Sequence, residues 1–301
     1  MRVVVAIDSF KGSMSSLEAG EAISKGIKKA HKDAEVEIRP LADGGEGTVE
    51  ALSIGMGGRL INVDVTGPVG RKVNAVYGIV DSSKTAIIEM SQAAGITLVS
   101  GNEKNPLYTT TFGVGELIKD AINKGCRHFV VGIGGSATND CGIGMLQALG
   151  YEFLDKEGKQ VGFGASGVRD IVSIRDENVI KELSECYFRV ACDVNNPLCG
   201  DLGCSAIYGP QKGATKEMVA DMDGWLKNYS KIVKEKYPDA DCEYPGTGAA
   251  GGLGYAFFNF TNSKLESGIK IVLDETKLEE YVKNADIVVT GEGRLDHQTV
   301  M

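Results

Sequence analysis

The sequence has few of the features that a disulfide or a metal site requires. Its seven cysteines are an odd number, and no two of them form a Cys-x-x-Cys pair. Cys192, Cys199 and Cys204 lie close together along the chain but without a nearby histidine, so their spacing does not fit a zinc site. We therefore expect reduced thiols, as in a cytoplasmic protein.

Long hydrophobic runs and an excess of positive charge are missing as well. The first apolar run, residues 3–7, ends at Asp8 and is too short for a signal peptide or a membrane span. The net charge of −9 argues against nucleic-acid binding as a main role, although a local site can still hold an anion. We expect neither a membrane nor a nucleic-acid partner, and a cytoplasmic location.

Several common catalytic motifs are also absent. No G-x-x-x-x-G-K-[ST] run marks a P-loop, and no G-x-S-x-G run marks a hydrolase nucleophile. The chain has three histidines, and none has an evident Ser or Cys partner in the sequence. Nucleophilic hydrolysis is therefore poorly supported.

Glycine, by contrast, is abundant, with 40 residues that cluster in loops. The clearest cluster, around residues 132–135, follows an apolar run that indicates a buried parallel strand and precedes a helical pattern at 143–149. Glycine lets a ligand approach the backbone, and the amides at a helix start suit an anion. We predict a phosphate or carboxylate site here. The alternative is an ordinary turn in which Asn139 or Asp140 caps the helix.

Aspartates recur where predicted strands end. Three buried-strand patterns are followed by Asp8, Asp43 and Asp193. In open α/β sheets, ligands bind beyond these carboxyl ends of the strands. Capping or turn formation would explain Asp8 or Asp43 taken alone, but the recurrence is also what a binding site would produce.

The order of these patterns predicts an α/β protein. Two βα units fill the first 55 residues, and a capping box with Ser15 and Glu18 begins the first helix. From residue 59 to residue 89, strand patterns alternate with turns, which predicts an antiparallel meander. The last predicted strand, residues 286–290, has no helix after it, so we expect the natural protein to continue beyond Met301.

The glycine loops leave more than one chemistry open. Residues 132–137 match a relaxed dinucleotide-binding pattern, and residues 246–251 match the strict one without a clear strand before it. A nicotinamide-dependent hydroxy-acid oxidoreductase and a non-catalytic sugar-acid binding protein therefore stay in view. Strand-end aspartates, glycine loops and the cations Lys11, Lys212 and Arg294 better suit phosphoryl transfer with Mg²⁺.

Six blocks of sequence resemble the signature of the type I glycerate kinases, and they span nearly the whole chain in the expected order. The blocks are residues 8–13, 41–48, 132–140, 191–194 with 196–198, 209–214 and 290–296. The resemblance implies phosphorylation of D-glycerate by ATP with Mg²⁺, giving 2-phosphoglycerate. It also implies two different α/β domains, with parallel or mixed sheets flanked by helices, one inserted into the other, and an active-site cleft between them.

Under this hypothesis, residues 1–65 and 285–301 form a discontinuous domain, and residues 66–284 form the inserted one. The sequence does not determine the oligomeric state, and a homo-oligomer is possible. The chemistry of the side chains leaves 2- and 3-phosphorylation undistinguished.

Roles for individual residues follow from side-chain chemistry. The catalytic candidates are Asp193, Lys11, Asp8 and Asp43, with Asp43 and Asp193 also proposed as Mg²⁺ ligands. The substrate-binding candidates are Arg294, Asp296, Asn195 and Lys212. The nucleotide-binding candidates are Gly134, Gly135, Ser136, Thr138, Asn139, Gly251 and Gly252. Which aspartate is the base and which holds the metal is open.

Overall fold

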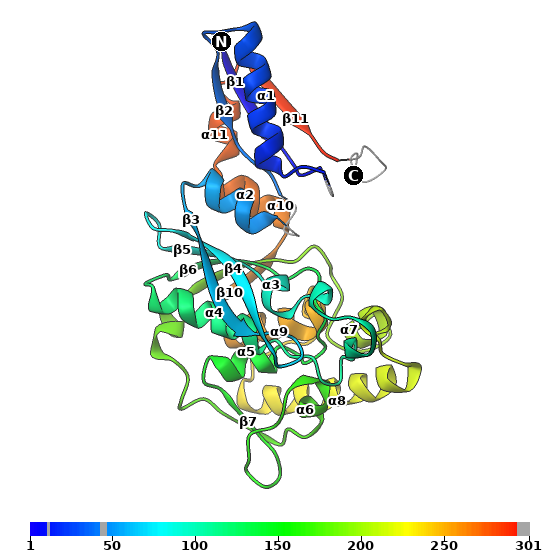
Figure 1. Ribbon diagram of the computed structural model, residues 1–301. Coiled ribbons are helices and arrows are strands. Elements are labelled where there is room, and N and C mark those ends of the chain that lie inside the picture. The colour runs from blue at the N-terminus through cyan, green and yellow to red at the C-terminus, as the bar shows by residue number, and fades with distance from the viewer. Residues whose placement is uncertain (11–12, 43–46, 294–301) are drawn as a thin grey trace.

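The structure is a computed structural model that describes residues 1–10, 13–42 and 47–293. Its strands form a three-stranded sheet, a six-stranded sheet and a two-stranded ribbon. The three-stranded sheet is parallel, with β1 (Arg2–Ile7) between β2 (Glu35–Ile38) and β11 (Ile287–Gly291). It lies with α1 (Ser16–Ala30) at one end of the molecule, away from the larger sheet (Figure 1).

The six-stranded sheet is mixed. Its order is β10-β9-β6-β5-β4-β3, and its outer three strands β5, β4 and β3 are antiparallel, as the meander prediction required. The remaining pairs are parallel. The strands are β3 (Arg59–Thr66), β4 (Lys72–Val80), β5 (Thr85–Glu89), β6 (His128–Gly132), β9 (Tyr187–Ala191) and β10 (Ser263–Glu266), and the ribbon pairs β7 (Glu152–Leu154) with β8 (Ser173–Arg175).

Helices cover both faces of the six-stranded sheet, because its central strands are apolar on both sides. On one face, α2 (Thr48–Gly55) and α10 (Gly268–Glu275) bury Leu52 and Val272 against Val130 of β6. The other face carries the main core, in which the rings of Phe129 and Phe188 stack with centroids 4.7 Å apart. The helices on that side include α4 (Phe112–Asn123), α5 (Ile143–Ala148) and α9 (Ala249–Phe260).

The other described helices are short, except for α8, which has 21 residues. They are α3 (Ser91–Ala94), α6 (Gly164–Arg169), α7 (Cys204–Tyr208), α8 (Lys216–Lys236) and α11 (Leu278–Val282), with short 3₁₀ turns at η1 (Ile96–Leu98), η2 (Gly101–Glu103), η3 (Lys181–Glu185) and η4 (Pro210–Lys212). Within the described ranges, none of the helices combines the length and the apolar content that crossing a membrane requires.

The chain enters the six-stranded sheet earlier than expected. β3 pairs with β4 over its whole length, so the boundary placed after residue 65 falls inside a strand of the larger sheet. The chain leaves the three-stranded sheet after β2 and returns to it with β11. That path is the one an inserted domain would follow, but the division into two domains stays a prediction.

Candidate active site

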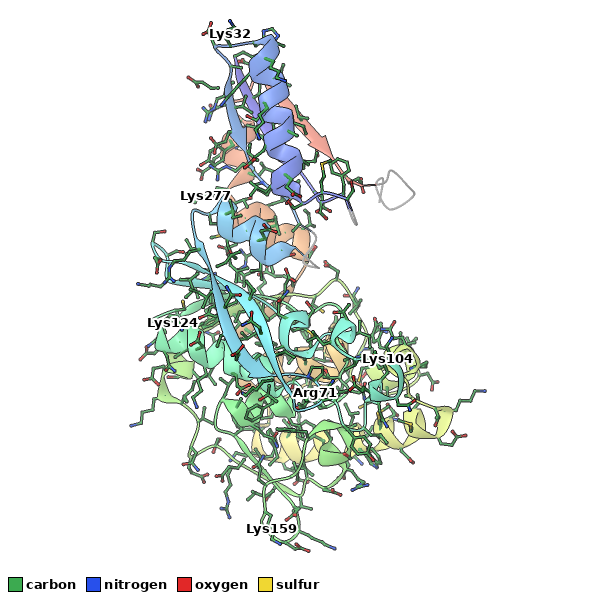
Figure 2. The ribbon with its side chains drawn as sticks, in the orientation of Figure 1. Lys32, Arg71, Lys104, Lys124, Lys159 and Lys277 are labelled. Carbon is green, nitrogen blue, oxygen red and sulfur yellow. The ribbon has the colours of Figure 1, made fainter. Side chains whose placement is uncertain are left out.

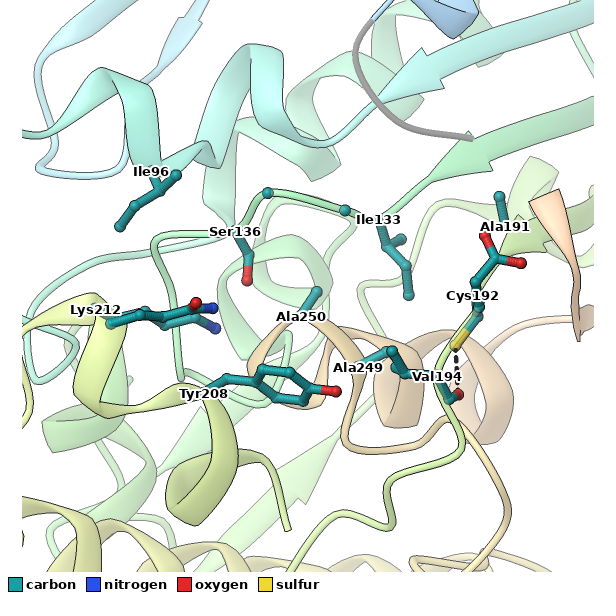
Figure 3. A pocket seen from close by; sticks show the side chains of 14 residues that line it. Ile96, Ile133, Ser136, Ala191, Cys192, Val194, Tyr208, Lys212, Ala249 and Ala250 are labelled. Atoms are coloured by element: carbon teal, nitrogen blue, oxygen red, sulfur yellow. Dashed lines mark hydrogen bonds between the residues drawn. The ribbon is translucent and has the colours of Figure 1, made fainter. Parts of the chain in front are cut away.

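A cavity of about 460 Å³ lies beyond the carboxyl ends of β6 and β9, where the strand-end argument placed a site. Lys212 and Tyr208 approach it from one side, and Ile133, Cys192 and Val194 lie opposite them (Figure 3). Its walls are Ile96, Ile133, Gly134, Gly135, Ser136, Ala191, Cys192, Asp193, Val194, Tyr208, Gln211, Lys212, Ala249 and Ala250.

The loop after β6 supplies the backbone wall of the cavity. A Cβ at Gly134 would meet no protein atom within 4 Å, and Gly135 has a φ of +73°, which favours glycine. The Gly135 carbonyl accepts a hydrogen bond from the Ile96 amide at 2.8 Å, which fixes the loop against η1. Gly134, Gly135 and the buried Ser136 thus line the cavity, and nucleotide binding by them stays a prediction.

Thr138 and Asn139 lie behind this wall rather than on it. Both are fully buried, and neither is among the residues that line the cavity. The Asn139 amide donates to Ser205 Oγ at 2.9 Å, so the side chain ties the loop to α7. Their polar side chains suggested ligand contact in the sequence, but their positions suit support of the loop.

Asp140 lies at the start of α5, the helix start that was predicted to bind an anion. Its buried carboxylate accepts hydrogen bonds from the Thr111 amide at 2.8 Å, the Thr111 hydroxyl at 2.9 Å and the Gly142 amide at 3.2 Å. It therefore sits at the starts of both α4 and α5, and burial raises its pKa. Asp140 therefore takes the Gly142 amide at the start of α5, as the alternative prediction of a capped helix allowed, and an anion site at this helix start stays a prediction. The loop amides remain anion-binding candidates as well.

Lys212 brings a buried cation to the cavity. Its side chain is 1% exposed, and its Nζ donates to the Thr138 carbonyl at 2.6 Å. Burial lowers its pKa to about 8, against the opposing influence of Cys204 and Asp140. An ammonium has three donors, so those not engaged by Thr138 are available to an anion in the cavity.

Asp193 brings a carboxylate to the same cavity. It follows β9, is exposed, and its Oδ1 accepts a hydrogen bond from the Gly268 amide at the start of α10, at 3.0 Å. Asn195 does not line the cavity. Instead its neighbour Asn196 accepts a hydrogen bond from the Tyr208 hydroxyl at 2.7 Å, which places that ring in the cavity wall.

Gly251 and Gly252 act behind the cavity and not in its wall. Ala250, Gly251 and Gly252 are three consecutive residues with left-handed backbone angles. The Gly251 carbonyl accepts from the Cys141 amide at 2.9 Å, and a Cβ on Gly251 would overlap the Thr138 carbonyl oxygen. The two glycines thus hold the loop that carries Thr138, while Ala249 and Ala250 face the cavity.

The remaining predicted residues lie elsewhere. Asp8 follows β1 and, with Ser9 and Glu50, lines a separate cavity of about 30 Å³. The candidates Lys11, Asp43, Arg294 and Asp296 lie outside the described residues. Sequence reasoning missed Tyr208, Cys192 and Ile96, whose apolar or aromatic character gave no sign that they meet at one cavity.

Comparison with known proteins gives a consistent result. A model of the "Glycerate kinase family" matches residues 3–301. A glycerate kinase from Haemophilus influenzae is 48% identical over 301 residues, covering 100% of this chain and 80% of the relative. Glycerate 2-kinase from Escherichia coli is 45% identical over 300 residues, covering 100% and 79%. The crystal structure of "putative glycerate kinase 2" from Salmonella typhimurium LT2 aligns with a TM-score of 0.96 and 46% identity, covering 100% of this chain and 80% of that one.

Proposed function

The chain belongs to the glycerate kinase family, and on that premise we propose that it transfers the γ-phosphoryl group of ATP to the 2-hydroxyl of D-glycerate, giving 2-phosphoglycerate and ADP. One observation carries the proposal. The cavity at the strand ends combines glycine-loop amides, the buried ammonium of Lys212 and the carboxylate of Asp193. These are the groups that phosphoryl transfer needs.

ATP fits the wall formed by the loop after β6. The backbone at Gly134 and Gly135 can approach phosphate oxygens closely because no side chain intervenes. Lys212, which lines the same cavity, neutralises the charge of the phosphates. The apolar side chains of Ile96 and Ile133 and the ring of Tyr208 offer the nucleotide base apolar contacts in the walls of the cavity.

The donors present also fit Mg²⁺ bound mainly by ATP. Among the described residues, there is no cluster of three or more His, Cys, Asp or Glu side chains that could hold a metal by itself. Mg²⁺ in kinases is usually held by one or two carboxylates together with phosphate oxygens and water, and Asp193 is a carboxylate in the cavity wall. When bound, Mg²⁺ would neutralise charge on the phosphates during transfer. Asp193 would serve either as its ligand or as the base that accepts the hydroxyl proton.

We keep two further expectations as proposals. The chain path from the three-stranded sheet through the six-stranded sheet and back supports two domains, one inserted into the other. The seven cysteines are all without disulfide partners, which supports the cytoplasmic location. The oxidoreductase and binding-protein alternatives are set aside, because the curated relatives are named as kinases.

The test supplies the protein with ATP, Mg²⁺ and D-glycerate, follows ADP release and identifies the product by phosphorus NMR. A 2-phosphoglycerate signal is expected. A 3-phosphoglycerate signal would keep the kinase and correct the position. Folded protein that releases no ADP would overturn the proposal.

Substitution by alanine should affect ATP binding at one glycine of this site and stability at another. Gly134→Ala is expected to weaken ATP binding about tenfold with no change in melting temperature, because its methyl meets only the space that the phosphates would fill. Gly251→Ala is expected to lower the free energy of unfolding by about 2–3 kcal/mol, because its φ is +67° and its methyl would overlap the Thr138 carbonyl.

Calorimetric ATP titration and thermal unfolding measure both effects, and each variant serves as the control for the other. A Gly134→Ala protein that binds ATP like wild type would show that the loop does not contact the nucleotide. A Gly251→Ala protein with wild-type stability would remove the supporting role of that residue.

A further inference from the structure

The chain passes between its two main sheets at one place. Pro40, which follows β2, and Thr276, which follows α10, both lie beside Gly55 at the end of α2, within 3.5 and 3.9 Å of the position of a Cβ there. Helix α2 packs on the six-stranded sheet through Leu52. Figure 1 shows α2 and α10 between the three-stranded sheet and the larger part of the molecule.

Arg39 links the elements that meet there. Its amide donates to the Val5 carbonyl at 2.8 Å, so its backbone continues the pairing of β2 with β1. Its Nη1 donates to the Gly55 carbonyl at 2.8 Å, and its Nη2 lies 2.7 Å from Glu37 Oε1. Its guanidinium carbon lies 3.5 Å from the ring centroid of Tyr281 in α11. One side chain, 12% exposed, thus joins the three-stranded sheet to both crossing segments.

The second crossing has an unusual backbone. Lys277 joins α10 to α11 with a φ of +52°, in the left-handed region that residues other than glycine seldom adopt. It lies at the junction between the two parts of the molecule (Figure 2). Hinges are built from a few such residues at the ends of elements, which absorb the backbone change when two bodies move.

We infer that Arg39 is a positioning residue for phosphoryl transfer: by holding Gly55 and Tyr281 it sets the placement of the three-stranded sheet, with Asp8 at its strand end, relative to the cavity that contains Asp193. The inference rests on the proposed function. Arginine suits this task because its planar fork can donate to a carbonyl and a carboxylate while its face stacks on an aromatic ring. Lysine cannot make the same set of contacts.

ATP binding and catalysis should then respond differently. Every residue that lines the main cavity lies between Ile96 and Ala250, in the part of the chain that belongs to the six-stranded sheet and its helices. Loss of Arg39 should therefore leave ATP affinity unchanged. The transfer step should slow, because small misplacement of reacting groups lowers rates strongly.

The experiment compares wild type, Arg39→Met, Arg39→Lys, Tyr281→Leu and the double variant Arg39→Met with Tyr281→Leu. Spin labels attached through a non-natural amino acid at the exposed positions Lys29 in α1 and Lys119 in α4 report the distance between the two parts. ATP affinity is measured by calorimetry, and kcat with D-glycerate. Arg59→Met is the matched control, because Arg59 pairs with Asp81 at 2.8 Å within the six-stranded sheet.

We expect each single variant to broaden the distance distribution, to lower kcat about tenfold and to leave the ATP Kd within about twofold of wild type. The double variant should be no worse than Arg39→Met alone, because Arg39→Met has already lost the contact that Tyr281→Leu removes. Arg59→Met should behave as wild type.

An unchanged distance distribution and kcat in Arg39→Met, as in Arg59→Met, would overturn the inference. So would equal losses of ATP affinity and kcat, which would indicate a general structural role. If Arg39→Met does not fold, Tyr281→Leu and Arg39→Lys must give the stated result or the inference is overturned. If wild type makes no phosphoglycerate but Arg39→Met still broadens the distance distribution, the proposed function is refuted. The role of Arg39 in placing the three-stranded sheet would then still hold.

Discussion

Asp193→Asn is expected to lower kcat about a thousandfold while ATP affinity stays within a few-fold of wild type. Asn has the shape of Asp, and its side-chain oxygen can still accept the hydrogen bond from the Gly268 amide, now 3.0 Å from Asp193 Oδ1. The start of α10 therefore keeps its partner, and only the negative charge is lost. Steady-state kinetics with ATP, Mg²⁺ and D-glycerate measure the effect.

The same variant separates the two roles left open for Asp193. If the carboxylate holds Mg²⁺, raising the Mg²⁺ concentration should restore much of the lost rate. If it accepts the hydroxyl proton, the rate should stay low at every Mg²⁺ concentration.

Asp223→Asn is the matched control for this experiment. Asp223 also accepts a backbone hydrogen bond, from the Gly200 amide at 2.7 Å, but it does not line the cavity. Its kcat should equal that of wild type. A kcat for Asp193→Asn within a few-fold of that control would remove Asp193 from the chemistry.

Local patterns were enough to predict much of the fold. The apolar runs before Asp8 and Asp193 are parallel strands, and the capping box of Ser15 and Glu18 begins α1. Local patterns could not predict which distant segments pair in the sheets. β11 lies beside β1, and β10 has the polar sequence Ser-Lys-Leu-Glu, whose Glu266 pairs with Arg189 at 2.8 Å. An edge strand held by an ion pair has no apolar signature to detect.

The strand-end rule located the cavity, but it could not tell which polar residues face it. Thr138, Asn139 and Asp140 have the composition of a ligand-binding loop, yet they are buried, and Asn139 and Asp140 bond to other parts of the protein. Polar side chains in a glycine loop serve ligands and neighbouring helix starts equally well. Only the tertiary partner, here Thr111 at the start of α4, distinguishes the two uses.

Under the proposed function, Lys212→Met is expected to lower kcat/KM about a thousandfold, because it removes the buried cation from the cavity wall, where it would neutralise charge on the transferred phosphate. Met fills a similar volume, so the buried site should stay packed. Lys234→Met is the matched control, because Lys234 also donates to a backbone carbonyl, that of Ala240 at 2.7 Å, away from the cavity. Equal activity in the two variants would contradict the assignment.

The low pKa of Lys212 also predicts how wild-type activity depends on pH. Burial brings the pKa to about 8, so the free enzyme loses the charged ammonium as the pH rises through that value. Wild-type kcat/KM should therefore fall above about pH 8. A pH–rate profile that is flat up to pH 10 would show that the charge on Lys212 is not required.

The same burial should make Lys212 a source of instability at neutral pH. Its pKa falls from 10.5 to about 8 on folding, so between these values the unfolded chain binds the proton that the folded chain has lost. The contribution of Lys212 to the free energy of unfolding must then rise with pH across this window and stay constant below and above it. The depression corresponds to about 3 kcal/mol.

Denaturant unfolding of wild type and Lys212→Met at pH 7, 8, 9 and 10 isolates this contribution, because the other titrating groups are common to both proteins. Relative to the variant, wild type should gain up to about 3 kcal/mol as the pH approaches 10.5. A constant difference between the two proteins would mean that Lys212 keeps its ordinary pKa when folded. Lys212 thus keeps a buried ammonium in the wall of the cavity at a cost in stability, which a role in catalysis explains and a role in stability does not.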